Sequence, residues 1–170
     1  MKLLLSGLGL FFVTSFYTLQ FQDSNGTTQS MGQYQGKKVL LVNIATGSAR
    51  AGQLAQLQQL QQLYADSLVV IAFPSNSFGH EPLSDSAIGQ YCQDHGYTFK
   101  LAAKQPVTGQ GMQSIYHWLA TQSENGMMAQ PVLADYQKFL INGSGMLVGV
   151  FSAATEPMGT QIRAAIGNSE

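Results

Sequence analysis

The chain has 170 residues, of which 45% are hydrophobic, a length and composition that suit one compact domain with a buried core. Only 10% of the residues are charged and the net charge is -1, so no basic surface is available to follow a phosphate backbone. We therefore do not expect nucleic acid as a partner. The single cysteine, Cys92, excludes an internal disulfide and a thiolate zinc site, and the three histidines have no metal-ligand spacing.

The first residues form an apolar leader. Met1 and Lys2 give a positive start, and residues 3–13 form an apolar run that is too short to cross a bilayer as a helix. This pattern is typical of a signal peptide. We therefore expect residues 1–15 to direct export to the periplasm or the cell exterior, with cleavage before Phe16, and residues 16–170 to form the domain. The alternative is an uncleaved leader on a cytoplasmic protein. We expect no stable transmembrane anchor in either case.

After the leader, the sequence predicts a hairpin, a buried strand and a helix. Residues 16–22 alternate in part, and the turn at residues 23–26 holds the Asn-Gly pair that favours a tight hairpin. Residues 39–45 form a continuous aliphatic run, typical of a strand covered on both faces. In the helix that follows, leucines recur at every third position, namely Leu54, Leu57, Leu60 and Leu63. We expect the glutamines around them to face water, these being Gln56, Gln58, Gln59, Gln61 and Gln62.

The second half of the chain continues the alternation of strands and helices. We expect a buried strand at residues 68–73, a helix at 84–96 with Ser84 as its N-cap, and a short strand at 97–101. The later elements are a helix that buries Trp118, a hairpin and a final helix, at residues 113–122, 138–151 and 157–166. These units predict an α/β fold class with a mixed central β-sheet flanked by helices and an N-terminal β-hairpin.

Five short motifs stand at characteristic distances from one another. They are Val-Asn-Ile-Ala-Thr-Gly-Ser-Ala at residues 42–49, Phe-Pro-Ser-Asn-Ser-Phe-Gly at 73–79, Glu81-Pro82, Tyr-His-Trp-Leu at 116–119 and Lys-Phe-Leu-Ile at 138–141. In this order they resemble the glutathione peroxidase family, over roughly residues 15–167. The resemblance implies a thioredoxin-like fold. It also implies hydroperoxide reduction without a bound cofactor, with glutathione or thioredoxin as the thiol donor.

The same resemblance implies where the reacting groups should lie. In the family, a cysteine or selenocysteine stands six residues after the valine of Val-Asn-x-Ala, and here that position holds Ser48. The supporting glutamine, tryptophan and asparagine correspond to Ser77, Ala134 and Asp135. Serine forms no sulfenic acid and is not ionised without a dedicated base, so we expect the peroxidatic site to be lost.

Ser48 has two further interpretations. Serine is a preferred N-cap residue, so the side chain is expected to cap a helix that begins near Arg50. A serine hydrolase site would require a histidine and an acid converging on Ser48. His80, His95 and His117 are available, but none lies in a Gly-x-Ser-x-Gly elbow.

Cys92 lies where many family members that use thioredoxin carry a resolving cysteine. It is expected either to be a small core residue or to form mixed disulfides with glutathione or a partner protein. The sequence as a whole predicts a non-catalytic binding or structural relative of the peroxidases. The alternatives are a one-cysteine redox protein acting through Cys92 and a residual peroxidase. The sequence does not indicate the oligomeric state or the binding partner.

Overall fold

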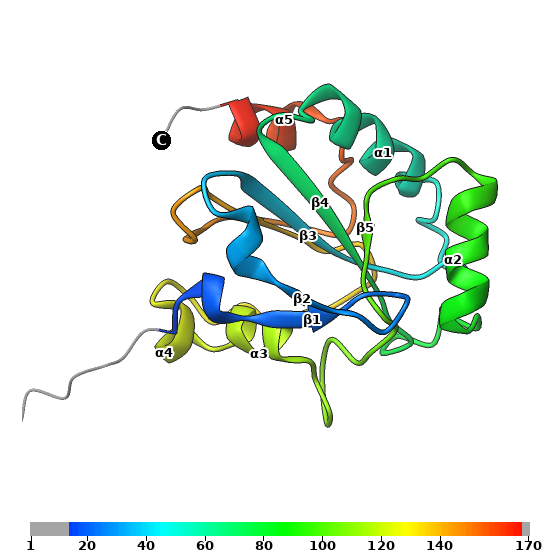
Figure 1. Ribbon diagram of the computed structural model, residues 1–170, viewed down its shortest axis with the longest axis horizontal. Helices are drawn as coiled ribbons and strands as arrows, with labels where there is room; N and C mark the ends of the chain where they lie inside the picture. The colour runs from blue at the N-terminus through cyan, green and yellow to red at the C-terminus, as the bar shows by residue number, and fades with distance from the viewer. Residues whose placement is uncertain (1–13, 168–170) are drawn as a thin grey trace, which may run out of the picture.

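The computed structural model describes residues 14–167 and contains a five-stranded mixed sheet in the order β5-β4-β3-β6-β7 (Figure 1). The central strands β3 (Lys38–Ile44) and β4 (Leu68–Pro74) are parallel, as expected for two buried aliphatic runs. The hairpin of β6 (Lys138–Ile141) and β7 (Leu147–Phe151) joins β3 antiparallel, and β5 (Lys100–Leu101) lies on the opposite edge. The mixed central sheet predicted from the sequence is confirmed.

Helices cover both faces of this sheet because successive strand residues point to opposite sides. Leu40 and Val42 pack against α1 (Gln53–Leu63), α2 (Asp85–Asp94) and α5 (Thr160–Gly167). Val39 and Leu41 pack on the other side against α3 (Ser114–Ala120) and β1 (Gln20–Gln22), which pairs with β2 (Thr28–Ser30). In Figure 1, α1 and α5 lie above the sheet, and β1, β2 and α3 lie below it. Three one-turn segments complete the fold, namely η1 (Phe16–Thr18), η2 (Met31–Tyr34) and α4 (Gln122–Asn125).

Several predicted elements are confirmed and some have different bounds. Ser84 caps α2 through a bond from the Ala87 N–H to its hydroxyl, as expected. The expected strand at residues 97–101 is reduced to the two residues of β5, and the helix at 113–122 ends at Ala120 before α4 begins. Leu63 is exposed, whereas Leu60 is buried. A three-residue repeat drifts around a helix of 3.6 residues per turn, so the fourth leucine leaves the buried face.

Two glutamines of α1 do not face water as predicted but cover an open edge of the sheet. β5 pairs with β4 only at Ile71 and Ala72, so the first part of β4 is paired with β3 on one side but has no strand on the side of β5. There the Gln61 amide accepts a 2.7 Å bond from the Val70 N–H and donates a 3.2 Å bond to the Leu68 carbonyl. Gln58 binds the backbone N–H and the hydroxyl of Thr98 in the same way. The helix thus supplies amide groups where a strand would otherwise pair.

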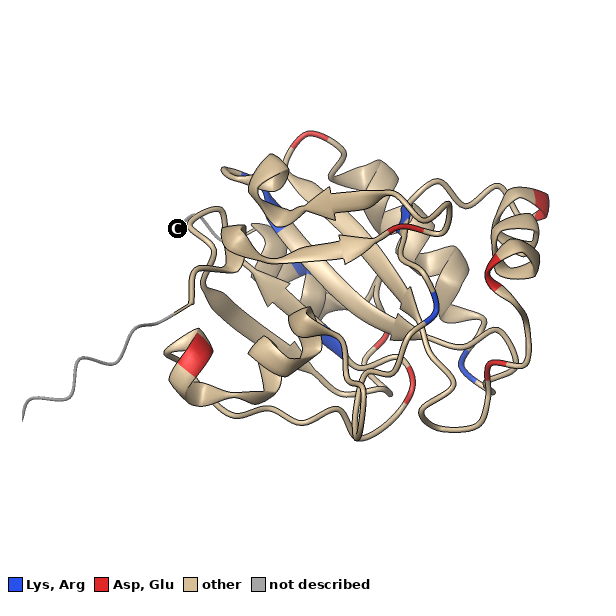
Figure 2. Ribbon diagram, turned by 60° about the horizontal axis from the view of Figure 1, so that its bottom comes forward, with Lys and Arg blue, Asp and Glu red and all other residues tan. Residues whose placement is uncertain are grey.

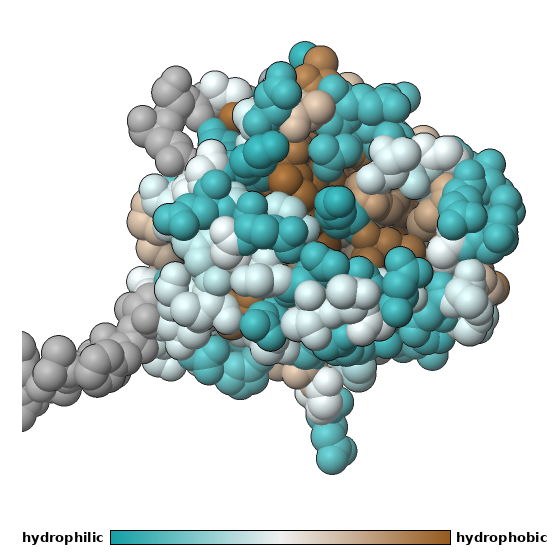
Figure 3. All heavy atoms as spheres, in the orientation of Figure 1, coloured by the Kyte–Doolittle hydropathy of each residue, from teal (hydrophilic) through white to brown (hydrophobic). Residues whose placement is uncertain are grey.

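A groove of about 490 Å³ runs beside this edge, between α1, η2 and β4. Figure 3 shows hydrophobic surface in a hollow over this part of the molecule, with hydrophilic side chains around it. Lys37 and Lys100 also line the groove. The groove lies by the start of β4, whereas the candidate site described below lies by its end.

The expected leader at residues 1–15 falls largely outside the described residues. Within them, the Thr14 N–H donates to Glu124 O at 2.8 Å, and its carbonyl accepts from Trp118 Nε1 at 2.7 Å. The chain from Thr14 onward is therefore packed against α3 and α4. Over residues 14–167, no helix has the length and hydrophobicity needed to cross a membrane.

Candidate functional site

The residues predicted as site positions lie at one end of the sheet. The loop after β3 carries Ser48, the loop after β4 carries Ser77 and His80, and the segment before β6 carries Ala134 and Asp135. Because β3 and β4 are parallel and β6 is antiparallel to β3, these three segments meet at the same end of the sheet, beyond the carboxyl ends of β3 and β4. The carboxyl ends of parallel strands are where α/β proteins commonly place ligands.

Ser48 lies in the turn between β3 and α1 and is only 7% exposed. The helix begins at Gln53 with Gly52 as its N-cap, so the prediction that Ser48 caps a helix beginning near Arg50 is wrong in its position. The backbone between them forms tight turns, with the Ala51 N–H bonded to Ser48 O, and regular helix starts only afterwards. The Ser48 hydroxyl accepts one long bond, of 3.4 Å, from the Arg50 N–H.

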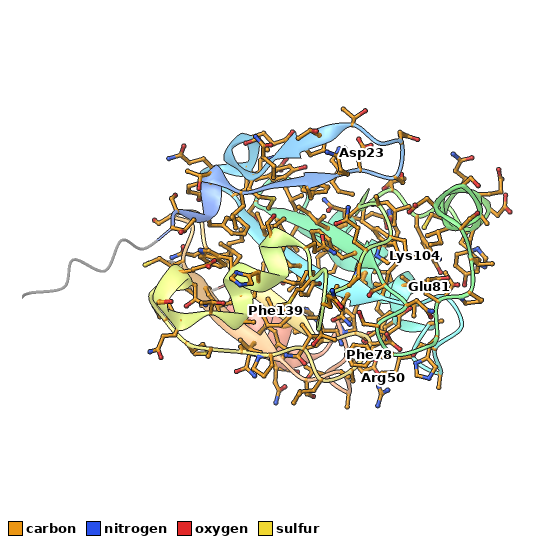
Figure 4. The ribbon with its side chains drawn as sticks, turned by 90° about the horizontal axis from the view of Figure 1, so that it is seen from below. Asp23, Arg50, Phe78, Glu81, Lys104 and Phe139 are labelled. Atoms are coloured by element: carbon orange, nitrogen blue, oxygen red, sulfur yellow. The ribbon has the colours of Figure 1, made fainter. Side chains whose placement is uncertain are left out.

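A buried carboxylate fastens the Ser48 loop to the loop after β4. Glu81 is 1% exposed and accepts bonds from the Thr46 N–H and hydroxyl at 2.7 and 2.8 Å. The Gly47 N–H donates to His80 O at 3.0 Å, and a Cβ at residue 47 would lie 2.8 Å from that oxygen. Only glycine allows this approach. Figure 4 shows Glu81, Phe78 and Arg50 on the same side of the molecule, away from the Asp23 turn.

A histidine and an aspartate form the clearest electrostatic contact of the site. His80 Nδ1 and Asp135 Oδ2 are 2.6 Å apart, and the Asp135 side chain is 2% exposed whereas that of His80 is 55% exposed. The second oxygen, Asp135 Oδ1, is buried without a hydrogen-bond partner among the described residues. Asn43 Oδ1 is also buried and unpartnered, while Asn43 Nδ2 donates to Ala134 O at 2.9 Å. The site therefore contains buried acceptors that lack donors.

The other two predicted positions serve the backbone. Ser77 accepts a 3.1 Å bond from the Val107 N–H and one from the Ser75 hydroxyl, which stiffens the loop after β4. Ala134 contributes only its carbonyl, to Asn43. Within the part of the chain that the structure describes, no hydrogen bond joins the Ser48 side chain to Ser77, Ala134 or Asp135. The fold thus brings the four positions to one end of the sheet, but it does not link the other three side chains to that of Ser48.

Cys92 lies on α2 and is buried among the apolar residues beneath that helix. Burial, together with the negative charge of Glu81, raises the pKa of the Cys92 thiol to about 11. A thiol that reacts by disulfide exchange needs appreciable thiolate and access to solvent. Both properties oppose the redox interpretation of Cys92 and agree with its interpretation as a core residue.

The sequence reasoning missed a buried ammonium group next to the site. Lys138 is fully buried, and its Nζ donates to Gln53 Oε1, Ala153 O and Thr155 O. Burial lowers the pKa of Lys138 to about 8. A lysine at the start of an otherwise apolar strand was the available signal, because such a side chain requires several acceptors.

The other charged residues that the structure describes form neither a patch of one sign nor a metal site. Figure 2 shows acidic and basic residues scattered over the molecule, without a patch of one sign. Among residues 14–167, no group of three or more histidine, cysteine or acidic side chains could hold a metal ion.

A sequence model of the family described as glutathione peroxidase matches residues 16–120, which is more than half of the chain. The chain belongs to the glutathione peroxidase family. It is 35% identical over 147 residues to the glutathione peroxidase-like peroxiredoxin 2 of Saccharomyces cerevisiae, covering 85% of this chain and 91% of the relative. It is 31% identical over 146 residues to a glutathione peroxidase of Lactococcus lactis, covering 84% and 92% of the two chains.

A solved structure gives the same result for the fold. The crystal structure of Trgpx in its apo form superposes with a TM-score of 0.68 and 28% identity, covering 91% of this chain and 97% of the other. The thioredoxin-like fold expected from the resemblance is confirmed. This member of the glutathione peroxidase family places hydroxyl groups and a His–Asp pair at the end of its central strands, and its single thiol is buried.

Proposed function

We propose that this glutathione peroxidase-family protein does not reduce hydroperoxides by thiol chemistry and acts as a non-catalytic binding or structural relative. One observation carries the proposal: the only cysteine of the chain is buried with its pKa raised to about 11, and Ser48 stands in the loop that follows Val-Asn-Ile-Ala. Peroxide reduction by a thiol requires an accessible thiolate that becomes a sulfenic acid. Neither Ser48 nor Cys92 offers one.

The surroundings of Ser48 support this interpretation. In the family, amide and indole groups donate to the developing thiolate, whereas here the corresponding positions are Ser77, Ala134 and Asp135. Ser77 uses its hydroxyl oxygen for Val107, Ala134 has no donor, and Asp135 brings a carboxylate. A carboxylate near a developing anion disfavours that anion. The loss of one donor would permit a modified mechanism, but all three have been replaced together with the thiol.

Peroxide consumption by the purified full chain tests the proposal. Hydrogen peroxide and a lipid hydroperoxide are each supplied with glutathione or with thioredoxin and its reductase. We expect the wild-type protein, a Ser48→Ala variant and a Cys92→Ala variant to match the rate in buffer alone. Turnover by the wild-type protein that either substitution removes would show that the chain is a peroxidase and overturn the proposal.

Rebuilding the site tests whether the positions are assigned correctly. A Ser48→Cys variant alone should react with peroxide hardly faster than a free thiol, because each missing positioned donor costs roughly 2.7 to 4 kcal/mol. Adding Ser77→Gln, Ala134→Trp and Asp135→Asn should raise the rate by orders of magnitude. Equal rates for the single and the quadruple variant would mean that these positions do not surround residue 48 as proposed.

A further inference from the structure

The groove beside the start of β4 is separate from the site that holds Ser48. Its volume of about 490 Å³ lies within the range of roughly 300–1,000 Å³ that small-molecule sites occupy. Neither Ser48 nor His80 nor Asp135 lines it. A ligand in this groove would therefore contact none of the positions that correspond to the peroxidase site.

The floor of the groove is apolar and belongs to the core. It consists of Leu68 and Val69 of β4 and the ring of Tyr34 from η2, and each of these residues is at most 9% exposed. Figure 3 shows this hydrophobic surface in its hollow, with hydrophilic side chains around it. Because the floor is packed before any ligand arrives, it offers a preformed surface for the apolar part of a molecule.

The backbone at the floor is already paired. The Val70 N–H and the Leu68 carbonyl, which point away from β3, are both bonded to the Gln61 amide. An extended peptide that added itself to this part of β4 would find neither group free, although such peptides bind mainly through backbone hydrogen bonds. The groove therefore suits a small molecule with an apolar body better than an added strand.

Two lysines at the groove have no acidic partner. Lys37 and Lys100 line it and are exposed, and within residues 14–167 neither ammonium group forms an ion pair or a side-chain hydrogen bond. No acidic residue lines the groove. Asp23 lines the adjoining hollow, but its oxygens already accept bonds from Asn25, Thr27 and Gln29. The groove thus carries positive charge that an anionic ligand would balance.

The two lysines lie on opposite sides of β4. Lys37 directly precedes Lys38, which pairs with Leu68 from the side of β3, whereas Lys100 pairs with Ile71 from the side of β5. Two strand spacings and about four residues of strand rise separate them, which puts their Cα atoms on the order of 15 Å apart. Cations at this separation suit two distinct anionic groups better than one.

The Tyr34 hydroxyl adds a hydrogen-bond donor near Lys100. Tyr34, like Lys100, lines both the groove and the adjoining hollow, and its hydroxyl has no hydrogen-bond partner among the described residues. Burial, followed by the charge of Asp23, raises the pKa of Tyr34. The hydroxyl therefore keeps its proton at neutral pH and can donate it to a carboxylate.

We propose that this groove binds a small linear dicarboxylate with an apolar middle. One carboxylate contacts Lys37, and the other contacts Lys100 and the Tyr34 hydroxyl. The methylene chain between them lies on Leu68 and Val69. Binding needs no thiol and no peroxide, so the proposal goes beyond the loss of peroxidase activity and does not depend on it.

Titration of the ¹⁵N-labelled full chain, followed by NMR, tests the proposal with sebacate as the ligand. Sebacate has about 14 non-hydrogen atoms, and an ordinary ligand efficiency gives such a molecule a Kd of about 1 mM or below. Decanoate keeps the chain but has one carboxylate, and succinate keeps both carboxylates but has a short middle. We expect both to bind roughly fivefold more weakly, the upper end of what one exposed ion pair contributes. The amides of Val69 and Lys100 should shift, and that of Ser48 should not.

Variants identify the charges that matter. Lys37→Gln and Lys100→Gln should each raise the Kd for sebacate roughly fivefold, and the double variant should no longer distinguish sebacate from decanoate. Arg163→Gln is the matched control, because Arg163 is an exposed cation on α5 that does not line the groove. It should keep the wild-type Kd.

Several results would overturn the proposal. They are the absence of groove shifts at 10 mM sebacate, equal Kd values for sebacate and decanoate in the wild-type protein, and an equal loss of affinity in Arg163→Gln, which would indicate unspecific attraction by net charge. Shifts confined to the Ser48 loop would assign the ligand to the other site. The peroxide assay described above is a separate measurement, so failure of either proposal leaves the other one standing.

Discussion

Replacement of Gln61 by alanine should destabilise the protein through the backbone of β4. The Gln61 amide is the partner of the Val70 N–H and the Leu68 carbonyl, and both of these residues are fully buried. Leaving a buried backbone group without a partner costs about 1–3 kcal/mol. Water from the adjacent groove can reach part of this edge, and alanine is the better helix former, by up to about 0.7 kcal/mol. We therefore expect a net loss of about 2 kcal/mol in the free energy of unfolding.

Thermal and urea denaturation measure this loss. For a chain of this size, 2 kcal/mol corresponds to a decrease of about 4–8 °C in the melting temperature. Gln62→Ala is the control, because Gln62 is exposed on the same helix and no hydrogen bond is assigned to it. Hydrogen exchange should show faster exchange of the Val70 amide in Gln61→Ala alone. Equal stabilities of the two variants would refute the role of Gln61 as a cover for the sheet edge.

Three further predictions concern Lys138, Cys92 and the leader. Because the pKa of Lys138 falls to about 8 in the folded protein, the unfolded chain binds more protons above that pH, so the contribution of Lys138 to stability should rise by about 2 kcal/mol between pH 8 and 10. The raised pKa of the Cys92 thiol acts in the opposite direction in the same range, so the Lys138 contribution is the difference between the wild-type protein and Lys138→Met. Denaturation of Lys138→Met should show no such rise; an equal slope in both proteins would contradict the assignment. Iodoacetamide should label Cys92 only after denaturation, and rapid labelling of the native protein, seen by mass spectrometry, would restore the redox interpretation. If the leader is removed on export, N-terminal sequencing should find a mature protein that begins near Phe16, and an unprocessed N-terminus would remove the expectation of export.

The strands and caps could be predicted because their causes are local. A continuous aliphatic run is enough to indicate β3, and the serine before an acidic first turn is enough to indicate the start of α2. The hairpin of β6 and β7 can likewise be predicted from its turn residues. In that turn the Asn142 side chain accepts hydrogen bonds from the N–H groups of Ser144 and Met146. In each case a few neighbouring residues contain the whole signal.

The parts that could not be predicted depend on residues far apart in the chain. In the sequence, nothing distinguishes Gln61 from the other glutamines of the helix. Its role depends on β5, which is too short to cover the first part of β4 and leaves the Val70 N–H to bond with Gln61. His80 and Asp135 are separated by 55 positions, and neither residue type indicates the other. The position of the Ser48 turn likewise follows from its attachment to the next loop and is not set by helix-capping preferences. The sequence therefore indicated where the site lies but not which of its groups are in contact.

The close approach at Gly47 has a consequence for mutational scans of this protein. Any side chain at that position would collide with the carbonyl of His80, so substitutions should be rejected whether or not the protein is an enzyme. Thr46 and Glu81 would show a similar intolerance because they connect the same two loops. A scan that scored only folding would thus highlight part of the peroxidase motif around Ser48. In this protein, sensitivity to mutation within the motif reports how two loops are fastened together, and it should not be used as a measure of surviving catalysis.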